Sequence, residues 1–456
     1  MSINILEQTD SYKVSHWKQY PKGTEHVISY LESRSEGEDI VFFGLQYILK
    51  MMEGTVITQK QLDDFVELMG ATFAHDYVNV KGWQYIIDNY DGNLPLMIHA
   101  VPEGTIVPSG NVLMTIRNTD PKCFWLTNYV ESLLMNVWMP ITRATQTYNL
   151  YKYMKDNYDY GDMLPFTLTD FSVRSAPSPE AGAIGGMAHL LCFKGTDNIP
   201  AMSLARKVYD APIDVAASVA AAEHSTIISY GRDKEVEAYR RIIESVPDEA
   251  LISIVADSYD IWNAIDNIFG GELRELIENR AGRTVVRPDS GNPIEVSVKV
   301  LQHLDKVFGS TELNGLKLLN SNVGVIYGDG INYNTIPQII DAVKEAGYHE
   351  TNIVFGAGGG LFNEQNRDTY KFAIKCSAVV INNKYNVVSK CPIDGDWKKS
   401  KKGTLNMIRT SDGTYKTIDV IEGVACNFDE YILRPIFYNG IIKKYKWSDI
   451  ISNMEK

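Results

Sequence analysis

The sequence predicts an α/β protein, in which an irregular parallel α/β barrel accompanies a mixed α+β domain formed by the N- and C-terminal regions. Seven short apolar runs between residues 166 and 358 each stop at a polar residue or a glycine, and most precede a helical pattern. Apolar strands that alternate with helices are typical of a parallel sheet buried on both faces. The stops are 27 to 40 residues apart, close to the length of one βα unit. They are Asp170, Asp197, His224, Asp257, Asp289, Asp329 and Gly358.

The regions on either side of the predicted barrel mix short strands and helices. We expect residues 1–150 to pack with residues 380–456, and residues 151–379 to form the barrel. Residues 27–31 and 96–101 are rich in strand-forming side chains. Residues 120–139 are apolar and aromatic at helical spacing, and Asp120-Pro121 is a plausible helix start.

Two helices of the barrel carry clear boundary signals. Asn292-Pro293 combines an N-cap residue with a proline at the first helical position, so a helix is expected through Phe308. Asn334 is expected to cap a helix that runs to Ala346, and Gly347 is the residue that would end it.

Composition excludes several classes of protein. The net charge of −13 argues against nucleic acid and anionic membranes as partners. Five scattered cysteines include no C-x-x-C pair, so neither a zinc site nor a disulfide framework is indicated; they are Cys123, Cys192, Cys376, Cys391 and Cys426. The N-terminus lacks the pattern of a signal peptide, and no apolar run approaches a membrane span. A cytoplasmic enzyme is expected.

Glycines and charged residues at the strand ends indicate a phosphate site. Residues 356–360 (Gly-Ala-Gly-Gly-Gly) and 328–330 (Gly-Asp-Gly) follow neighbouring strands, where glycine lets backbone N–H groups approach an anion. Arg287 suits phosphate, and Asp289 suits ribose hydroxyls or hydrated Mg²⁺. The alternatives are tight turns and an ordinary ion pair.

His224 is the candidate for proton or phosphoryl chemistry. It follows Glu223, and Asp257 ends the next strand, so a carboxylate could fix the tautomer of the ring. The alternative is a satisfied core histidine. Phe171 and Arg174 follow another strand, where the aromatic ring is either a stacking platform or part of the core.

These residues occur in motifs whose order resembles the nicotinamide phosphoribosyltransferase family, a group of type II phosphoribosyltransferases. The resemblance runs from about residue 3 to beyond 440. It rests on the motifs TDSYKVSH (9–16), FGLQY (43–47), DFSVR (170–174), KGTD (194–197), AEHST (222–226), DSYD (257–260), RPDSG (287–291), GDG (328–330) and GAGGG (356–360).

The resemblance implies an activity and an assembly. The family makes nicotinamide mononucleotide and pyrophosphate from nicotinamide and phosphoribosyl pyrophosphate (PRPP), a step of NAD salvage. It implies an irregular α/β barrel, a homodimer with shared active sites, Mg²⁺, and ATP as a co-substrate that acts through a phosphorylated histidine.

The resemblance also assigns residue roles. Phe171 and the partner subunit's Tyr12 would sandwich the pyridine ring. Arg174 would bind near the amide and the ribose phosphate, and Asp197 would accept from the amide NH₂. His224 would carry the phosphoryl group, oriented by Glu223 and Asp257.

The remaining roles concern the sugar and the phosphates. Arg287 and Asp289 would hold the diphosphate, Mg²⁺ and ribose hydroxyls. Asp329 would face the ribose, with Gly328 beside it also expected to contact substrate. The other expected phosphate contacts are Gly358 and Gly359 at the 5′-phosphate, and the partner subunit's Arg367 with Lys401 or Lys402 at pyrophosphate or ATP.

Three rival functions remain at this stage. Nicotinate phosphoribosyltransferase shares the fold and the donor, but Asp197 would repel a carboxylate. A different phosphosugar enzyme would need a strand-end lysine or glutamate base, and no obvious lysine occupies a strand end. A catalytically inactive binding protein conflicts with the intact His224, Arg287 and Asp289. Ser172 and Ser175 stand where the family usually has glycine, so the loop after Asp170 is expected to be shaped differently.

Overall fold

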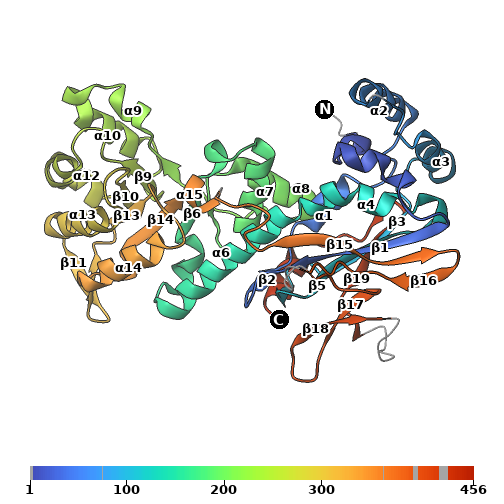
Figure 1. Cartoon of the computed structure of the whole chain (residues 1–456). Helices are drawn as coiled ribbons and strands as arrows, with labels where there is room; N and C mark the ends of the chain where they lie inside the picture. Colours follow the sequence, from blue (N-terminus) through green and yellow to red (C-terminus); the bar gives the residue numbers. More distant parts are fainter. Residues whose placement is uncertain (1–3, 74, 363, 394–398, 421–429) are drawn as a thin grey trace. The chain divides into compact units, whose positions relative to one another are not determined.

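The computed structural model describes residues 4–73, 75–362, 364–393, 399–420 and 430–456. The chain divides into two compact units (Figure 1). Unit 1 comprises residues 1–145, 207–211 and 365–456, and unit 2 comprises residues 146–206 and 212–364. The second boundary falls at 365 rather than at the expected 380. The strand Phe372–Ile381 lies within the sheet of unit 1, between two neighbouring strands, and therefore belongs to that unit.

Unit 1 is built on a seven-stranded antiparallel sheet with the order β16-β15-β1-β5-β3-β19-β20. The sheet joins the two ends of the chain, because β1 pairs with β15 along its whole length, from Thr24 opposite Ile381 to Ser33 opposite Phe372. The strands of unit 1 are β1 (Thr24–Ser33), β2 (Asp39–Val41), β3 (Leu96–Ala100), β4 (Ile106–Pro108), β5 (Val112–Asn118), β15 (Phe372–Ile381), β16 (Lys384–Val387), β17 (Leu405–Arg409), β18 (Tyr415–Asp419), β19 (Arg434–Tyr438) and β20 (Ile441–Ile442).

Helices pack against this sheet through a large apolar core. They are η1 (Ile5–Glu7), η2 (Ser11–Lys18), α1 (Leu45–Lys50), α2 (Gln59–Thr72), α3 (Val80–Tyr90), η3 (Pro121–Cys123), α4 (Leu126–Tyr129), α5 (Glu131–Met135), α6 (Trp138–Asn157, which continues into unit 2) and α16 (Trp447–Met454). The predicted helix start at Asp120-Pro121 is confirmed, since the Asp120 side chain accepts from the Lys122 N–H at the start of η3. The helical stretch over residues 120–139 is not one helix, because η3, α4, α5 and the start of α6 share it. The changes of direction let Trp125 and Tyr129 pack edge-on against the buried Trp83.

A short segment in the middle of the sequence also belongs to unit 1. Residues 207–211 carry Tyr209, whose hydroxyl donates to the buried carboxylate of Glu103 at 2.6 Å. The backbone N–H groups of Gly44 and Gln46 donate to the same carboxylate at 2.8 and 2.6 Å. Burial raises the pKa of Glu103, and these three donors oppose that rise. The network therefore fixes the segment to unit 1.

Unit 2 contains the predicted barrel. Its seven parallel strands have the order β7-β6-β14-β13-β10-β9-β8. A parallel bridge between Gly195 and Ala217 links β7 to the segment before β8, so the sheet curls into an irregular barrel. This confirms the predicted fold class. The strands are β6 (Leu168–Asp170), β7 (Gly195–Thr196), β8 (Ala220–Ala221), β9 (Ile252–Val255), β10 (Thr284–Arg287), β13 (Val323–Tyr327) and β14 (Ile353–Ala357).

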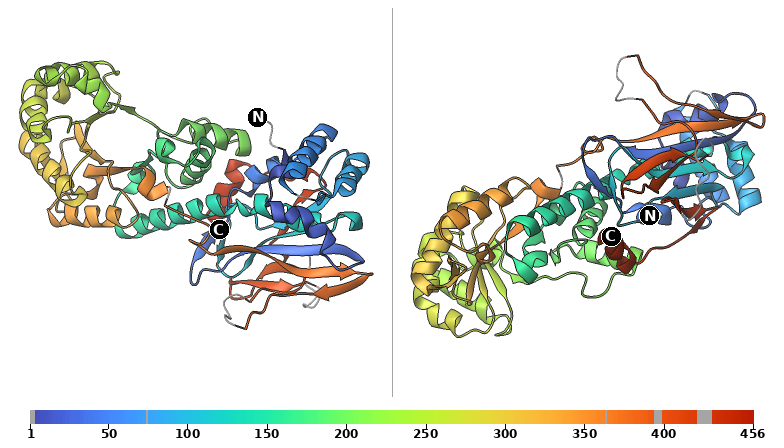
Figure 2. Two further views of the ribbon diagram at one scale, coloured as in Figure 1. Left: turned by 45° about the horizontal axis from the view of Figure 1, so that its top comes forward. Right: turned by 90° about the horizontal axis from the view of Figure 1, so that it is seen from below.

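Helices follow the strands and lie outside the curled sheet (Figure 2). They are η4 (Gly161–Phe166), η5 (Val173–Ser175), α7 (Pro179–His189), α8 (Ile199–Tyr209, whose last three residues belong to unit 1), α9 (His224–Ile228), η6 (Arg232–Lys234), α10 (Glu235–Glu244), α11 (Ile261–Asn263), the π-helix η7 (Ala264–Glu272), α12 (Arg274–Glu278), α13 (Pro293–Phe308), α14 (Thr335–Glu345), η8 (Glu350–Asn352) and α15 (Gly359–Phe362). A hairpin of β11 (Ser310–Leu313) and β12 (Leu316–Leu319) follows α13.

The two predicted helix starts in unit 2 are capped in different ways. The Asn292 side chain accepts from the backbone N–H groups of Ile294 and Glu295, which confirms it as the cap of α13. Asn334 makes no such bond at the start of α14. The cap is supplied two residues earlier by Asn332, whose side chain accepts from the N–H groups of Asn334 and Thr335. Gly347 ends the helix with a φ of 86°.

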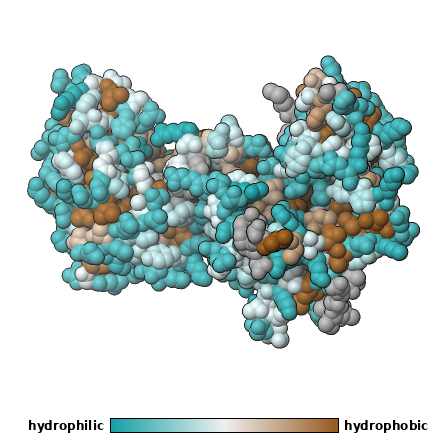
Figure 3. Space-filling model, viewed as in Figure 1, coloured by the Kyte–Doolittle hydropathy of each residue, from teal (hydrophilic) through white to brown (hydrophobic). Residues whose placement is uncertain are grey.

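The surface of unit 2 on the face shown in Figure 3 is mostly hydrophilic, with small separate apolar patches. Among the described residues, no helix combines the length and the apolar character that a membrane crossing requires. Cys123, Cys192, Cys376 and Cys391 are free thiols, and Cys426 lies outside the described residues.

Candidate active site

The carboxyl ends of the barrel strands carry the residues that the sequence singled out in unit 2. Because the strands are parallel, their carboxyl ends meet at one edge of the sheet. The residues at or just beyond this edge are Asp170 and Phe171 after β6, Asp197 after β7, Glu223 and His224 after β8, Asp257 after β9, Arg287 and Asp289 at β10, Gly328 and Asp329 after β13, and Gly358 and Gly359 after β14. The fold thus places these residues at one end of the barrel.

His224 stands between two carboxylates of neighbouring strands. Its Nε2 atom lies 3.0 Å from Asp257 Oδ1, and its Nδ1 atom lies 4.0 Å from Asp289 Oδ2. The histidine side chain keeps 41% of its surface exposed, whereas Asp257 is only 10% exposed. Glu223 accepts a hydrogen bond from the Ser225 hydroxyl. The contact at Nε2 therefore assigns the orientation of His224 to Asp257, while the side chain of Glu223 is engaged with its own helix start.

Asp257 also holds the loop that carries Asp289. Its second oxygen accepts from the Ser290 hydroxyl at 2.6 Å and from the backbone N–H of Asp289 at 3.3 Å. The Tyr327 hydroxyl donates to the carbonyls of Ser290 and Gly291 at 3.3 and 3.2 Å. The sequence analysis did not single out Ser290 or Tyr327. Ser290 lies within the 287–291 motif, but no sequence signal marks Tyr327.

The electrostatic environment of Asp289 combines carboxylates with two basic groups. Burial raises the pKa of Asp289, and the neighbouring Asp257 and Asp329 raise it further. Arg287 and His224 act in the opposite direction and lower the pKa. Arg287 and His224 favour a ligand with phosphate oxygens. The three carboxylates favour a cation that is bound together with that ligand.

Phe171 is positioned by the strand β14. Its backbone N–H donates to the Ala357 carbonyl at 2.8 Å. A Cβ atom at Gly356 would stand 1.9 Å from Phe171 Cε2, so the ring occupies the space that any larger residue at 356 would need. A Cβ at Gly328 would meet the ring at 3.5 Å and Asp289 at 3.6 Å.

The glycines after β14 therefore differ in what surrounds them. Gly356 was expected to serve anion binding as part of the glycine run, but its lack of a side chain makes room for Phe171. A Cβ at Gly358 would meet no atom within 4 Å, so protein packing does not require glycine there. Gly359 is the first residue of α15.

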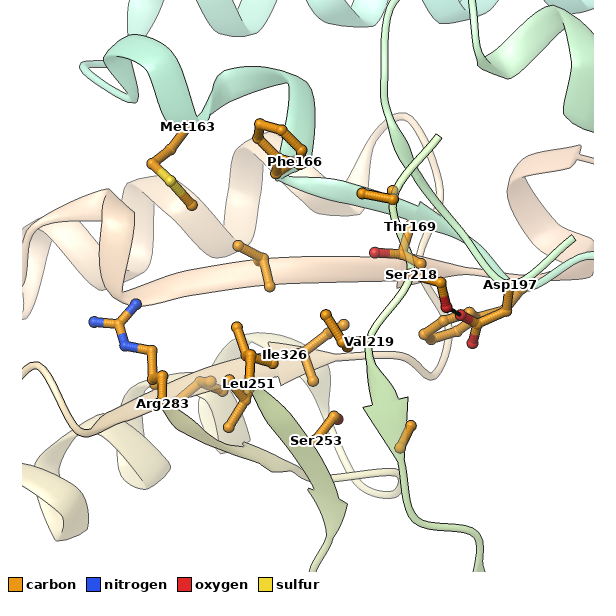
Figure 4. A pocket seen from close by; sticks show the side chains of 18 of the residues that line it. Met163, Phe166, Thr169, Asp197, Ser218, Val219, Leu251, Ser253, Arg283 and Ile326 are labelled. Atoms are coloured by element: carbon orange, nitrogen blue, oxygen red, sulfur yellow. Dashed lines mark hydrogen bonds between the residues drawn. The ribbon is translucent and has the colours of Figure 1, made fainter. Parts of the chain in front are cut away.

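Asp197 faces the same cavity as Phe171. Its Oδ1 atom accepts from the Ser218 hydroxyl at 2.8 Å (Figure 4). Partial desolvation raises the pKa of Asp197, whereas the Ser218 hydrogen bond and the charge of Arg287 lower it. Ser218 is a further residue that the sequence analysis did not single out. Arg174 lies in the exposed helix η5.

The interior of the barrel is hollow. Barrels of this type are usually filled by layers of branched side chains. Here several inward positions are small, and a cavity of about 260 Å³ remains (Figure 4). The small inward residues include Thr169, Gly195, Ala221, Ser253 and Gly324. The cavity extends from Phe171 and Asp197 at the carboxyl ends of the strands into the barrel.

Four predicted site residues lie in unit 1 and form their contacts there. Tyr12 is 59% exposed on η2, and its ring contacts His16 edge-on. Arg367 donates to the adjacent Asp368 at 3.1 Å. Lys401 forms an ion pair with Glu32, and Lys402 is exposed.

Two more cations of unit 1, Arg34 and Lys375, lie near these residues. Arg34 Nε donates to Glu32 at 2.7 Å. Burial lowers the pKa of Lys375, and the nearby charges of Arg34, Lys390 and Arg367 lower it further, while Glu131 raises it. The sequence analysis did not select either residue, because a single arginine or lysine in a strand resembles any surface cation.

Within the described ranges, no group of three or more His, Cys, Asp or Glu side chains is arranged to hold a metal ion. A cation at Asp289 would therefore need ligands from water or from a bound phosphate compound.

Comparison with known proteins adds family models that cover most of the chain. Residues 4–98 match the model of the nicotinamide phosphoribosyltransferase N-terminal domain. Residues 166–422 match the model of the nicotinate phosphoribosyltransferase (NAPRTase) family. The two matches include residues of both units identified in the structure.

Curated relatives match nearly end to end. The chain is 44% identical to a nicotinamide phosphoribosyltransferase of Xanthomonas campestris pv. campestris, over 96% of this chain and 95% of that protein. It is 32% identical to a nicotinamide phosphoribosyltransferase of Acinetobacter baylyi, over 90% and 89% of the two chains.

Solved structures with the same fold are more distant in sequence. A nicotinate-nucleotide pyrophosphorylase from Pyrococcus furiosus aligns with a TM-score of 0.63 at 17% identity, covering 99% of this chain and 95% of that one. Human nicotinic acid phosphoribosyltransferase aligns with a TM-score of 0.59 at 14% identity, covering 98% and 93%. At these identities the likeness concerns the fold alone.

Proposed function

This chain belongs to the nicotinamide phosphoribosyltransferase family, and we propose that it transfers the phosphoribosyl group of PRPP to nicotinamide. The products are nicotinamide mononucleotide and pyrophosphate, as in NAD salvage. One observation carries the choice of base: an aromatic ring, Phe171, and a carboxylate, Asp197, line the same cavity at the carboxyl ends of the strands. A planar heterocycle with an amide substituent complements both groups.

Asp197 supports nicotinamide over nicotinate. Its Oδ1 atom is engaged by Ser218, so Oδ2 remains to accept a hydrogen bond from an amide NH₂. A nicotinate carboxylate at the same place would face a second negative charge. Nicotinate phosphoribosyltransferase is therefore the alternative activity, and Asp197 is the residue that disfavours it.

The donor would bind across the ends of β10, β13 and β14. Arg287 would contact the diphosphate, and Asp289 and Asp329 would face the ribose. Gly358 and Gly359 would cradle the 5′-phosphate through backbone N–H groups, and the open space at Gly358 supports this role. Asp289, whose neighbours are carboxylates, would hold Mg²⁺ through water or diphosphate, and the ion would supply neutralising charge to the departing pyrophosphate.

In the reaction, the ring nitrogen of nicotinamide forms a bond to C1 of the ribose as the bond from C1 to pyrophosphate breaks. The electron pair of that bond leaves with pyrophosphate, and positive charge develops at the sugar. Arg287 would stabilise the leaving polyanion, and Asp289 and Asp329 would stabilise the cationic sugar. Phe171 would hold the ring in the plane needed for attack.

ATP would act through His224. Because Asp257 engages Nε2, the Nδ1 atom is the nitrogen that remains to attack the γ-phosphoryl group. The new N–P bond forms as the bond to ADP breaks, and ADP leaves. Asp257 would act as a positioning residue that fixes the tautomer and stabilises the charged ring, while Glu223 would secure the start of α9.

A second subunit would complete each site. The partner subunit's Tyr12 would cover the base, and Arg174 would bind near the amide and the ribose phosphate. The partner subunit's Arg367 with Lys401 or Lys402 would neutralise pyrophosphate or ATP phosphates. Arg34 and Lys375 share the environment of Arg367 in unit 1, which supports adding them to this group.

One experiment tests the proposed function directly. The protein is incubated with PRPP and Mg²⁺ and with either nicotinamide or nicotinate, with and without ATP. Mass spectrometry then identifies the mononucleotide. We expect nicotinamide mononucleotide to form, and ATP to raise its yield. Nicotinate mononucleotide as the main product would favour the alternative activity.

A further inference from the structure

One carboxylate of the candidate site bonds to two different parts of the barrel at once. Asp257 follows β9, and its side chain is only 10% exposed. Its Oδ1 atom lies 3.0 Å from the Nε2 atom of His224. Its Oδ2 atom accepts from the Ser290 hydroxyl at 2.6 Å and from the backbone N–H of Asp289 at 3.3 Å. The two oxygens of one side chain therefore join the proposed phosphoryl acceptor to the loop of residues 288–291, which bears Asp289.

The 288–291 loop lies between β10 and α13 and is also held from β13. Tyr327, the last residue of β13, donates from its hydroxyl to the carbonyls of Ser290 and Gly291 at 3.3 and 3.2 Å. Burial and the neighbouring carboxylates raise the pKa of this hydroxyl to about 12, so it stays protonated and remains a donor at neutral pH. These two bonds hold the backbone of the loop without passing through Asp257.

The connection from His224 to the loop depends on the hydroxyl of Ser290. At 2.6 Å this bond is short, as expected where a hydroxyl donates to an ionised carboxylate, whereas the Asp289 N–H lies 3.3 Å away. Glu223, beside His224, accepts from the Ser225 hydroxyl at the start of its own helix. Ser290 thus makes the shorter of the two bonds that tie Asp257 to the loop.

Phosphorylation would change what His224 presents to Asp257. A phosphoryl group on Nδ1 leaves Nε2 as the ring nitrogen that carries a proton, so Nε2–H donates to Asp257 Oδ1. The phosphoryl group would also place negative charge beside Asp289, whose Oδ2 atom lies 4.0 Å from Nδ1. Because Oδ1 and Oδ2 belong to one rigid group, a shift of Asp257 toward the ring also shifts the oxygen that holds Ser290.

We propose that Ser290 is a positioning residue that couples the phosphorylation of His224 to the binding of PRPP. The ring acts on Oδ1 of Asp257, and Ser290 carries the response of the same carboxylate to the loop that bears Asp289. Coupling between two binding equilibria is reciprocal, so bound PRPP favours the phosphorylated state as much as phosphorylation favours PRPP. This inference rests on the proposed route of ATP through His224 and adds the residue through which that route reaches the PRPP site.

Removal of the Ser290 hydroxyl tests the coupling. The kcat/KM for PRPP is measured for the full chain with and without ATP, and a separate incubation with labelled ATP measures phosphohistidine. We expect ATP to raise kcat/KM of the wild-type chain by about 5-fold to 150-fold, the usual range for coupled sites, and that of Ser290→Ala by less than about 2-fold. The label should persist in Ser290→Ala, because the contact between His224 and Asp257 remains.

Tyr327→Phe is the matched control, since it removes a hydroxyl that bonds the same loop but not Asp257. It should change kcat/KM for PRPP by the same factor with and without ATP, so the ratio stays that of the wild-type chain. Ser290→Thr keeps a hydroxyl at an exposed position and should retain the effect of ATP. Thermal melting shows that each variant is folded before the ratios are compared.

The inference is overturned if Ser290→Ala takes the label and keeps the wild-type ratio, because the charge of the phosphoryl group would then act on Asp289 directly. An equal loss of the ratio in Tyr327→Phe would also overturn it, since any loosening of the loop would suffice. Loss of the label in Ser290→Ala would assign Ser290 to the phosphorylation step rather than to coupling. A wild-type chain that takes no label would instead overturn the proposed route of ATP, and this inference with it.

Discussion

The ring of Phe171 fills the space that a side chain at Gly356 would need, since a Cβ there would stand 1.9 Å from Phe171 Cε2. Phe171 directly follows β6, Gly356 lies on the neighbouring strand β14, and the N–H of Phe171 donates to the carbonyl of Ala357, the residue after Gly356. The platform proposed for the base is thus set by the absence of a side chain on the next strand.

The first prediction follows from this contact. Gly356→Ala should displace the Phe171 ring, destabilise the fold by about 1–3 kcal/mol through overpacking, and raise the KM for nicotinamide. Steady-state kinetics and thermal melting measure the two effects. Gly358→Ala is the matched control, because its added methyl group meets no atom within 4 Å. It should leave the KM for nicotinamide unchanged and affect PRPP instead. Equal effects of both variants on nicotinamide would contradict the assignment.

The second prediction concerns base selection by Asp197. Asp197→Asn should weaken nicotinamide by about 1.5–3 kcal/mol, the contribution of one charged hydrogen bond, and narrow the gap to nicotinate. The ratio of kcat/KM for the two bases measures it. An unchanged ratio would show that another residue selects the base.

The same selection should depend on pH. The pKa of Asp197 is raised above its ordinary value of 3.8, so the carboxylate is lost as pH falls through that raised value. The preference for nicotinamide should decline over this range, because a neutral acid no longer repels nicotinate. Ser218→Ala removes a hydrogen bond that lowers this pKa. The decline should then begin at a higher pH, and the same midpoint in both proteins would contradict the role of Ser218.

The third prediction concerns His224. After incubation with labelled ATP, the protein should carry a phosphate that is stable in base and labile in acid, as expected for phosphohistidine. His224→Ala should abolish the label and the stimulation by ATP, yet retain basal transfer. Asp257→Asn should reduce the rate of labelling, because the ring loses the carboxylate 3.0 Å from Nε2. Labelling that persists in His224→Ala would identify a different acceptor.

The fourth prediction concerns stability. Tyr209→Phe removes a hydrogen bond to the buried Glu103 carboxylate and should lower the free energy of unfolding by about 1.5–3 kcal/mol. The folded-state pKa of Glu103 is raised, so the native state binds its proton more tightly than the unfolded state does. Stability therefore falls as pH rises above the unfolded value. The loss in Tyr209→Phe should be larger at neutral pH than in mild acid, and denaturant titrations at both pH values measure it. A pH-independent loss would contradict a change in the protonation of Glu103 over this range.

The fifth prediction tests the shared site. Tyr12→Ala chains and His224→Ala chains are mixed under conditions that exchange subunits. If each site combines one barrel with the partner's Tyr12, each heterodimer has one site with both changes and one with neither. Random exchange then leaves about a quarter of all sites intact, and activity rises above either parent. If Tyr12 served its own barrel, every site would keep one change and mixing would restore nothing.

The sequence predicts the barrel well because each strand end is marked by a polar residue or glycine after an apolar run. Prediction from the sequence fails where the direction of the chain depends on tertiary contacts. Residues 120–139 have the composition of one helix, but the packing of Trp125 and Tyr129 on Trp83 requires several short ones. Likewise, Asn332 and Asn334 are equally good caps by composition, and only the backbone decides between them.

The residues of the candidate site likewise divide into those that the sequence predicts and those that only the folded structure identifies. The charged residues of unit 2 could be selected from the sequence because carboxylates, arginine and histidine at strand ends are uncommon in a purely structural role. The contributions of Ser218 and Tyr327 could not be predicted, because each bonds to a residue that follows a different strand. The hollow interior depends on small residues of several strands that coincide only in the folded barrel.

The pairing of β1 with β15 has a consequence for synthesis of the chain. Ser33 of β1 cannot pair with Phe372 of β15 until the ribosome has synthesised the residues between them, so the central sheet of unit 1 cannot form completely before then. At about 5–20 residues per second, this delay is on the order of tens of seconds on the ribosome. Residues 146–364 are synthesised before β15, so all of unit 2 has been made before unit 1 is complete. During that time β1 presents an unpaired edge, the feature that promotes association between chains and engages chaperones.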